Sequence, residues 1–363
     1  MNKLEATIRT IKPLDEVVMK AATERQNALT KPQGSLGVLE ELSIKLAGIQ
    51  GKIRPRIGKK TVIVMAGDHG VSEEGVSAFP SEVTLQMVYN FLRGGAGINV
   101  ISRFVHAEVL VVDIGVAARL ELHPRLLDRK VRRGTANISK GAAMSREDAL
   151  KSLEIGIEVA DEAVKQGADV IGTGDMGIGN TTASSAILAA FTELPLDWVV
   201  GRGTGIDEEK WELKKKIIHQ ALVVNKPDRS DPIDVLVKVG GFEIGGLAGC
   251  ILGAAAHRVP VVIDGFISGA AALLAAELEP KVVDYMFASH LSVEPGHKLI
   301  LERLGLRPIF QLDMRLGEGT GAALGMHILD LSARILSEMA TFSEAGVSGA
   351  KKDPGDESKR VKK

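Results

Sequence analysis

Hydrophobic residues recur at helical spacing through the first fifty residues of the chain. One series is Leu4, Ile8, Ile11 and Leu14, and a second is Leu36, Leu39, Leu42, Leu46 and Ile49. Steps of three or four residues place apolar side chains on one face of a helix. Pro32 and Gly34 separate the two series. The pattern predicts a smaller helical subdomain over residues 1–52.

From about residue 60 the pattern changes to short apolar runs that alternate with longer helical segments. Strands are predicted at residues 61–66, 108–114, 168–172, 197–201, 259–264, 284–288 and 308–312. Helices are predicted at 81–103, 145–166, 181–191, 208–223, 243–257, 269–278, 294–304 and 321–338. Runs rich in β-branched residues that alternate with helices indicate an α/β fold, a mostly parallel sheet covered by helices on both faces. We predict this domain over residues 53–342, followed by a polar, disordered tail over 343–363.

Glycine-rich loops follow the predicted strands. They cover residues 66–70, 172–182, 201–207, 264–265, 289–292 and 316–321. Open α/β sheets bind ligands outside the carboxyl ends of their strands. We therefore expect these loops to line one site, although glycines also serve simply to end strands in tight turns.

Two of these loops have the features of a phosphate site. Thr181 or Asn180 can cap the helix that begins there, and Gly177 leaves a backbone N–H group open. Gly203 precedes another helix, on which Lys214 either adds a positive charge to the site or lies on a solvated face. Two such loops can bind one phosphomonoester.

Glu318 differs from the other acidic residues of the chain. It stands between Gly317 and Gly319 at the head of an apolar helix, where it has no evident packing role. A glutamate in the first turn of a helix can also be a plain partner of the helix dipole. Both interpretations remain open from the residues alone.

Composition and missing motifs narrow the function. The chain has 45 Lys and Arg against 46 Asp and Glu, which argues against a nucleic-acid binder. The single cysteine, Cys250, lies in an apolar run and excludes an internal disulfide. The charged N-terminus and the interrupted apolar runs predict a cytoplasmic protein with no membrane span. Phosphate-loop and zinc-helix motifs do not occur, and the eight histidines are scattered, so no metal site is expected.

The glycine-rich loops belong to longer motifs that occur in order between residues 20 and 342. They are KPQGSLG at 31–37, AGDHGVS at 66–72, FPSEVTLQMV at 79–88, GGAGIN at 94–99, GDMGIGNTT at 174–182, GRGTG at 201–205, GGFEI at 240–244, VIDGF at 262–266 and RLGEGTGA at 315–322. Together they resemble the nicotinate-nucleotide–dimethylbenzimidazole phosphoribosyltransferase family. Each motif is weak alone, but their shared order is specific.

The resemblance implies an enzyme of cobalamin lower-ligand synthesis. Such an enzyme displaces nicotinate from nicotinate mononucleotide with a benzimidazole-type base, inverts the anomeric carbon and yields alpha-ribazole 5'-phosphate. It implies small-molecule substrates, no metal or organic cofactor, and a homodimer. The leaving group is already a cationic pyridinium, so the protein must position two substrates and remove one proton.

The resemblance also implies a role for individual residues. Glu318 is the general base, and Asp175 is a secondary carboxylate at a position where the family often has glutamate. The contacts to phosphate and nucleotide are Gly177, Gly203, Lys214, Gly265 and Ser292, and the base-binding residues are Phe79, Ser81 and Gln86. Asp68 and His69 are expected either near the opening of the base-binding pocket or as a structural hydrogen-bonded pair.

Two other functions compete with this one. A related phosphoribosyltransferase can use a different acceptor, such as a phenol or a purine, because apolar pockets discriminate between acceptors by only a few kcal/mol. A non-catalytic nucleotide-binding regulator is the second alternative. The carboxylate at Glu318 argues against a regulator, since a pure binder needs no base there.

Overall fold

The computed structural model describes residues 2–348, which fall into two compact units. One unit contains residues up to Leu14 together with Ile57–Asp330, and the other contains Asp15–Arg56 and the residues from Leu331 onward. The boundaries at residues 52 and 342 stay predictions. Residues 342–345 form a short helix, α15 (Phe342–Ala345), and the rest of the predicted tail from residue 349 lies outside the described residues.

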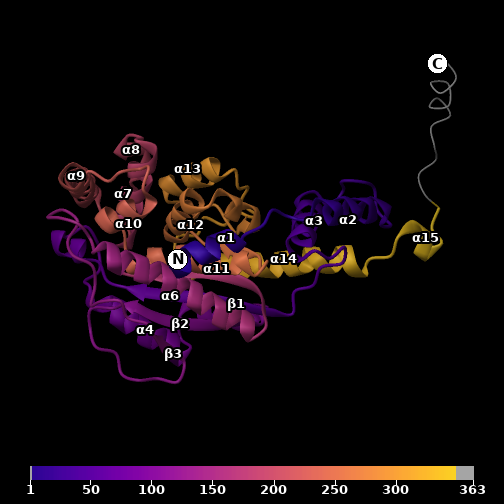
Figure 1. Cartoon of the computed structure of the whole chain (residues 1–363), viewed down its shortest axis with the longest axis horizontal. Helices are drawn as coiled ribbons and strands as arrows, with labels where there is room; N and C mark the ends of the chain where they lie inside the picture. The colour runs from indigo at the N-terminus through magenta and orange to yellow at the C-terminus, as the bar shows by residue number, and fades with distance from the viewer. Residues whose placement is uncertain (1, 349–363) are drawn as a thin grey trace, which may run out of the picture. The chain divides into compact units, whose positions relative to one another are not determined.

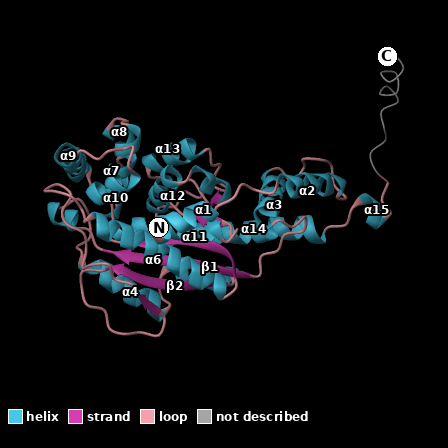
Figure 2. Cartoon of the chain, in the orientation of Figure 1, coloured by secondary structure: helices cyan, strands magenta, loops and turns pink. Residues whose placement is uncertain are grey.

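The larger unit is built on six parallel strands in the order β3-β2-β1-β4-β5-β6. Figure 2 draws strands in magenta, with β1 and β2 labelled among the surrounding helices. The strands are β1 (Lys59–Gly67), β2 (Ala107–Gly115), β3 (Leu126–Asp128), β4 (Ala168–Met176), β5 (Val261–Ile263) and β6 (Met286–Ala288). The central strands β1 and β4 are almost wholly buried. The order places β2 and β3 on one side of β1 and β4, β5 and β6 on the other, and open sheets of this kind bind ligands outside the carboxyl ends of their strands.

Helices cover both faces of the sheet, which confirms the predicted fold class. On β1, Met65 contacts Gly246 of α11 (Phe242–Ala256), and Val62 contacts Gly319, just before α14 (Thr320–Glu338). Successive side chains of a strand point to opposite faces, so α11 and the start of α14 lie on opposite sides. Helix α6 (Arg146–Lys165) packs beside α11, as Figure 1 shows.

The remaining helices complete the two units. The larger unit also contains α1 (Lys3–Thr10), α4 (Glu82–Arg93), α5 (Gly97–Val105), α7 (Asn180–Thr192), α8 (Leu196–Val199), α9 (Glu208–Asn225), α10 (Pro232–Val239), α12 (Phe266–Leu278), α13 (Pro295–Leu304) and the 3-10 helices Gly70–Glu74 and Pro280–Tyr285. The smaller unit contains α2 (Glu16–Ala28) and α3 (Val38–Gln50). Among residues 2–348 no helix has the length and apolar character needed to cross a membrane.

Three predicted elements are wrong. The strand predicted at 197–201 is the short helix α8, because Pro195 starts a helical turn after α7 ends. The strand predicted at 308–312 forms only an isolated bridge from Phe310 to His290. The helix predicted at 81–103 is two helices, since Gly94 adopts a left-handed conformation that ends α4. Strand β3 and helix α10 were not predicted.

Burial explains the single cysteine. Cys250 is fully buried in α11, and burial raises the pKa of its thiol to about 12. The thiol therefore stays protonated and acts as a small core residue, as predicted.

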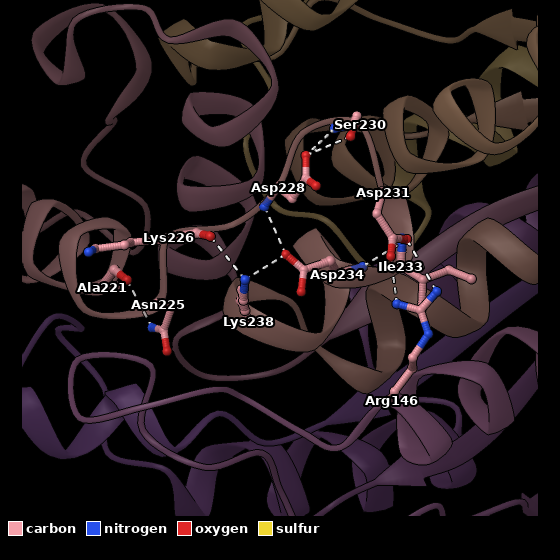
Figure 3. Close-up of polar contacts among 10 residues, drawn as sticks. All are labelled: Arg146, Ala221, Asn225, Lys226, Asp228, Ser230, Asp231, Ile233, Asp234 and Lys238. Carbon is pink, nitrogen blue, oxygen red and sulfur yellow. Dashed lines mark hydrogen bonds and ion pairs between the residues drawn. The ribbon is translucent and has the colours of Figure 1, made fainter.

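A polar network fixes the turn between α9 and α10 (Figure 3). The carboxylate of Asp231 accepts hydrogen bonds from the backbone N–H groups of Ile233 and Asp234, which caps α10, and it pairs with Arg146 at 2.6 Å. The side chain of Asp234 accepts a hydrogen bond from the N–H of Asp228 and pairs with Lys238. The turn is thus held mainly by carboxylates that accept backbone N–H groups.

The cap at Asp231 should contribute more stability than its ion pair. Asp231→Ala should lower the free energy of unfolding by about 1 kcal/mol, because two N–H groups lose their acceptor. Arg146→Ala removes only a half-exposed ion pair and should cost less than about 0.5 kcal/mol. Urea unfolding of the two variants measures the difference, and a larger loss for Arg146→Ala would contradict this assignment.

Candidate active site

A cavity of about 130 Å³ lies at the carboxyl ends of β4, β5 and β6. Its wall is formed by the loops after these strands, the loop before α9, and the loop that leads into α14. Five residues predicted for the site line it, namely Asp175, Gly177, Gly203, Gly265 and Ser292. Loops that lie far apart in the sequence, from Asp175 to Arg315, therefore meet at one place.

The turn that carries Glu318 has an unusual backbone. Gly317, Glu318 and Gly319 have φ angles of 80°, 60° and 86°, a run of three left-handed residues. Glycine adopts this conformation freely, but glutamate does so only at some cost in energy. The turn also presses against β4, since a Cβ at Gly174 would lie 2.6 Å from the carbonyl oxygen of Glu318. Only glycine at position 174 permits this approach.

Asp264 holds this turn in place from the end of β5. Its Oδ2 accepts a hydrogen bond from the N–H of Gly319 at 3.1 Å, and its Oδ1 accepts one from the N–H of Ala322 at 3.0 Å. The side chain is buried, and burial raises the pKa of Asp264 to about 7 although these N–H groups oppose the shift. Asp264 belongs to the VIDGF motif, but its role in holding this turn was not predicted.

The Glu318 carboxylate points to the start of α5. Its Oε2 accepts a hydrogen bond from the N–H of Ile98 at 3.0 Å, and the side chain is buried. Burial raises the pKa of Glu318, while the N–H groups of Ile98 and Gly97 act in the opposite direction. Burial is the stronger effect. The N-terminus that it meets is that of α5 rather than that of its own helix, and Glu318 lies behind the cavity wall at Gly317.

Asp175 is the second acidic group at this end of the cavity. Its Oδ2 accepts a hydrogen bond from Asn180 Nδ2 at 2.9 Å, and its buried Oδ1 has no partner among residues 2–348. Burial raises the pKa of Asp175 well above its usual range, and the negative charges of Asp264, Glu243 and Glu318 raise it further. Asp175 therefore keeps its proton to a higher pH than an ordinary aspartate, and its protonated form can donate a hydrogen bond.

The predicted capping of α7 is wrong. Neither Asn180 nor Thr181 caps the helix, whose N-cap is Gly179 with φ 96°. Asn180 donates to Asp175 instead, and Thr181 Oγ1 accepts a hydrogen bond from Lys214. Because the turn at Gly179 starts the helix without a side-chain cap, Asn180 and Thr181 can bind Asp175 and Lys214.

Lys214 is a buried cation rather than a residue of a solvated face. Its side chain is fully buried, and its Nζ donates to Thr181 Oγ1 at 2.9 Å and to the carbonyl of Gly201 at 3.3 Å. Burial lowers the pKa of Lys214 to about 8, while the negative charge of Glu294 opposes the shift. At neutral pH Lys214 is therefore mostly an ammonium group beneath the loop of Gly203.

Two further groups of the predicted phosphate site already have partners. The N–H of Gly203 donates to Glu294 Oε1 at 2.8 Å, and the N–H of Ser292 donates to His297 Nδ1 at 3.0 Å. Burial lowers the pKa of His297 to about 3, so its ring is neutral and can accept this bond. No motif around Glu294 predicted a role for this residue.

The predicted base-binding residues lie outside the cavity wall. Phe79, Ser81 and Gln86 are exposed and are not among the residues that line the cavity. Their segment is nevertheless attached to it, because the N–H of Ala78 donates to Thr204 Oγ1 at 3.0 Å. Thr84 Oγ1 similarly accepts from the N–H of Ile178. The contacts of these three residues with a base remain predictions.

Asp68 and His69 do not pair with each other. His69 Nε2 lies 2.6 Å from Glu243 Oε1, and both side chains are buried. Asp68 Oδ2 accepts a hydrogen bond from the N–H of Ala117 at 2.8 Å. Burial tends to lower the pKa of His69, but the charge of Glu243 and its hydrogen bond raise it. The pair is a buried hydrogen-bonded contact, and His69 packs against the loop of Gly177 and Gly179.

This architecture is that of a phosphoribosyltransferase. The chain matches the phosphoribosyltransferase family over residues 11–347. Two relatives named nicotinate-nucleotide–dimethylbenzimidazole phosphoribosyltransferase come from Chloroflexus aggregans and Roseiflexus sp. They are 60% and 59% identical, over 97% and 96% of this chain and 99% of each relative. The crystal structure of CobT from Thermus thermophilus is similar with a TM-score of 0.89 and 49% identity, over 92% of this chain and 100% of that one.

The chain belongs to the nicotinate-nucleotide–dimethylbenzimidazole phosphoribosyltransferase family. The resemblance seen in its sequence is thereby confirmed, and the chain is an enzyme.

Asp264 should control turnover through the Glu318 turn. In Asp264→Asn the amide nitrogen faces one of the two backbone N–H groups and cannot accept its hydrogen bond. Loosening the turn should lower kcat about tenfold and leave the nucleotide KM nearly unchanged. Asp169 is a matched control, because it accepts the N–H groups of Gly58 and Lys59 at the opposite end of β4.

Steady-state kinetics of Asp264→Asn and Asp169→Asn measure the effect. Equal kcat values in the two variants would remove the positioning role from Asp264.

Proposed function

We propose that this enzyme transfers the phosphoribosyl group of nicotinate mononucleotide to dimethylbenzimidazole or a related base. Attack of a base nitrogen on the anomeric carbon breaks its bond to the pyridinium nitrogen, and nicotinate leaves with the electron pair. The anomeric carbon inverts, and the product is alpha-ribazole 5'-phosphate for cobalamin synthesis. The observation that carries the proposal is a buried carboxylate, Glu318, held behind the wall of a cavity whose Gly203 loop covers a buried lysine.

The reaction asks for one proton acceptor. The leaving pyridinium is neutralised as its bond breaks, so it needs no acid. The attacking base becomes cationic and must lose its N–H proton, which we assign to Glu318. Burial raises the pKa of Glu318, which brings it closer to the pKa of an effective general base at neutral pH.

Asp175 is assigned a different role from Glu318. Asp175 lines the cavity, and its raised pKa suits its carboxyl to donating a hydrogen bond to a ribose oxygen. Its other oxygen accepts a hydrogen bond from Asn180 at 2.9 Å. We thus assign the role of proton acceptor to Glu318 and that of hydrogen-bond donor to Asp175.

The phosphate is assigned to the opposite end of the cavity. Gly177, Gly203 and Ser292 line that end, and Lys214 supplies its positive charge from below. Gly265 lies beside the nucleotide in this assignment. The exposed segment of Phe79, Ser81 and Gln86 is assigned to the base.

The same proposal includes a cytoplasmic homodimer that acts on small molecules and not on nucleic acid. The near balance of 45 basic and 46 acidic residues supports the last point.

The direct test is an incubation with nicotinate mononucleotide and dimethylbenzimidazole, followed by chromatography and NMR of the anomeric proton. Free nicotinate and an alpha-riboside phosphate are the expected products. If nicotinate is released only when a phenol or a purine is added, the assignment of the acceptor is wrong. If the nucleotide binds but no nicotinate is released, the protein is better explained as a regulator.

Glu318→Gln should reduce kcat on the order of a hundredfold, since a positioned base contributes about that much. Circular dichroism should show an unchanged fold. In the wild type, kcat should fall as pH drops through the pKa of Glu318, which lies above the 4.5 of an unperturbed glutamate, because only the deprotonated form accepts the proton. This acid limb should be absent in Glu318→Gln, and an identical limb in both proteins would assign it to another group.

Lys214→Ala should act on the nucleotide rather than on the base. Removing the buried ammonium should raise the KM for nicotinate mononucleotide about tenfold or more. The KM for dimethylbenzimidazole should stay within about twofold. Lys215→Ala is the control, since Lys215 pairs with Asp197 and Glu212 away from the cavity. An effect confined to the base substrate would contradict the phosphate role of Lys214.

A further inference from the structure

A buried acid occupies the end of the cavity assigned to the phosphate. Glu294 precedes Pro295 at the start of α13, is 7% exposed, and lines the cavity. Its Oε1 accepts the N–H of Gly203 at 2.8 Å. Its Oε2 is buried without a hydrogen-bond partner in the described part of the chain, and it packs directly on Gly201.

This position conflicts with a bound phosphate. Glu294 takes the N–H group that a phosphate oxygen would take, and it places a negative charge near Lys214. Two anions at such short range repel each other strongly in a partly buried site. A carboxylate in this place therefore competes with a phosphate for the N–H of Gly203 and repels its charge.

A second cavity gives the carboxylate a place to go. It has a volume of about 410 Å³ and shares Gly203, Glu294 and Arg315 with the first cavity. Arg202 lines the second cavity and not the first, so a displaced carboxylate meets additional positive charge there.

We propose that Glu294 is an internal competitor of the nucleotide phosphate and thereby sets the affinity of the enzyme for it. Before the nucleotide binds, the carboxylate accepts the N–H of Gly203, while Lys214 donates to Thr181 and Gly201. When the phosphate enters, it takes over the N–H of Gly203 and Glu294 turns toward Arg202 and Arg315. The assignment rests on the proposed function, because it requires that the phosphate of the nucleotide binds at Gly203.

Glu294→Gln tests the competition. The amide keeps the shape and can still accept the N–H of Gly203, but it carries no charge. The KM for nicotinate mononucleotide and the Kd for inorganic phosphate should both fall on the order of tenfold, with kcat within about twofold. Glu294→Asp keeps the charge and should show no gain in affinity. Glu208→Gln removes an exposed carboxylate that pairs with Arg202 on the same loop and is the control.

Kinetics give the KM values, and calorimetry with inorganic phosphate gives the Kd without any need for turnover. A higher KM and weaker phosphate binding in Glu294→Gln, or equal values in that variant and the wild type, would overturn the competition. If Glu294→Gln binds phosphate more tightly but the wild-type protein releases no nicotinate, the competition is supported and the proposed reaction is contradicted. If Glu294→Gln fails to fold, the prediction is tested by Glu294→Ala, which also removes the charge and should also bind phosphate more tightly.

Discussion

The hydrogen bonds from Gly319 and Ala322 to Asp264 are the interaction on which the site depends. They anchor a turn in which a glutamate adopts a left-handed conformation between two left-handed glycines. Such a backbone persists only where its surroundings determine it, and here β4 and β5 do so. The same turn starts α14, presses on Gly174 and directs the Glu318 carboxylate to the N-terminus of α5. The position of the Glu318 carboxylate is therefore fixed by β4, β5 and the start of α5.

Buried charge of both signs surrounds the cavity. Asp175 lines it, Asp264 and Glu318 lie behind its lining, and burial raises the pKa of all three. Lys214 is buried beneath the loop of Gly203, with its pKa lowered to about 8. The proposed reaction matches this arrangement, since the nucleotide brings a phosphate and the benzimidazole gives up a proton. Among the described residues that line the cavity, Asp175 and Glu294 are the acids.

Much of the fold was predictable because its strands are continuous apolar runs and its long helices have clear boundaries. The failures have local causes. The segment at 197–201 has the β-branched residues of a strand, but it follows Pro195 and has no neighbouring strand with which to pair. The segment at 308–312 bonds to the end of β6 through the N–H of Ile309 and forms an isolated bridge to His290 beyond it, too little for a strand ladder. Gly94 breaks a helix whose apolar spacing continues on both sides.

The candidate site was predictable where glycine and charge occur together, as at Gly177 and Glu318. Partners across the fold were not, because nothing in the sequence joins Asp264 to Gly319, Asn180 to Asp175, or Glu294 to Gly203. These contacts arise only when parallel strands bring their carboxyl ends together. Likewise, only the structure shows that burial outweighs hydrogen bonding in setting the direction of the pKa shift of Glu318.

A crystal structure with alpha-ribazole 5'-phosphate bound would test the central claim most directly. The account predicts that the unsubstituted nitrogen of the base lies about 3 Å from a carboxylate oxygen of Glu318, within hydrogen-bond reach. It also predicts the phosphate against Gly177, Ser292 and the loop of Gly203. A base bound far from Glu318, with another carboxylate at its nitrogen, would contradict it.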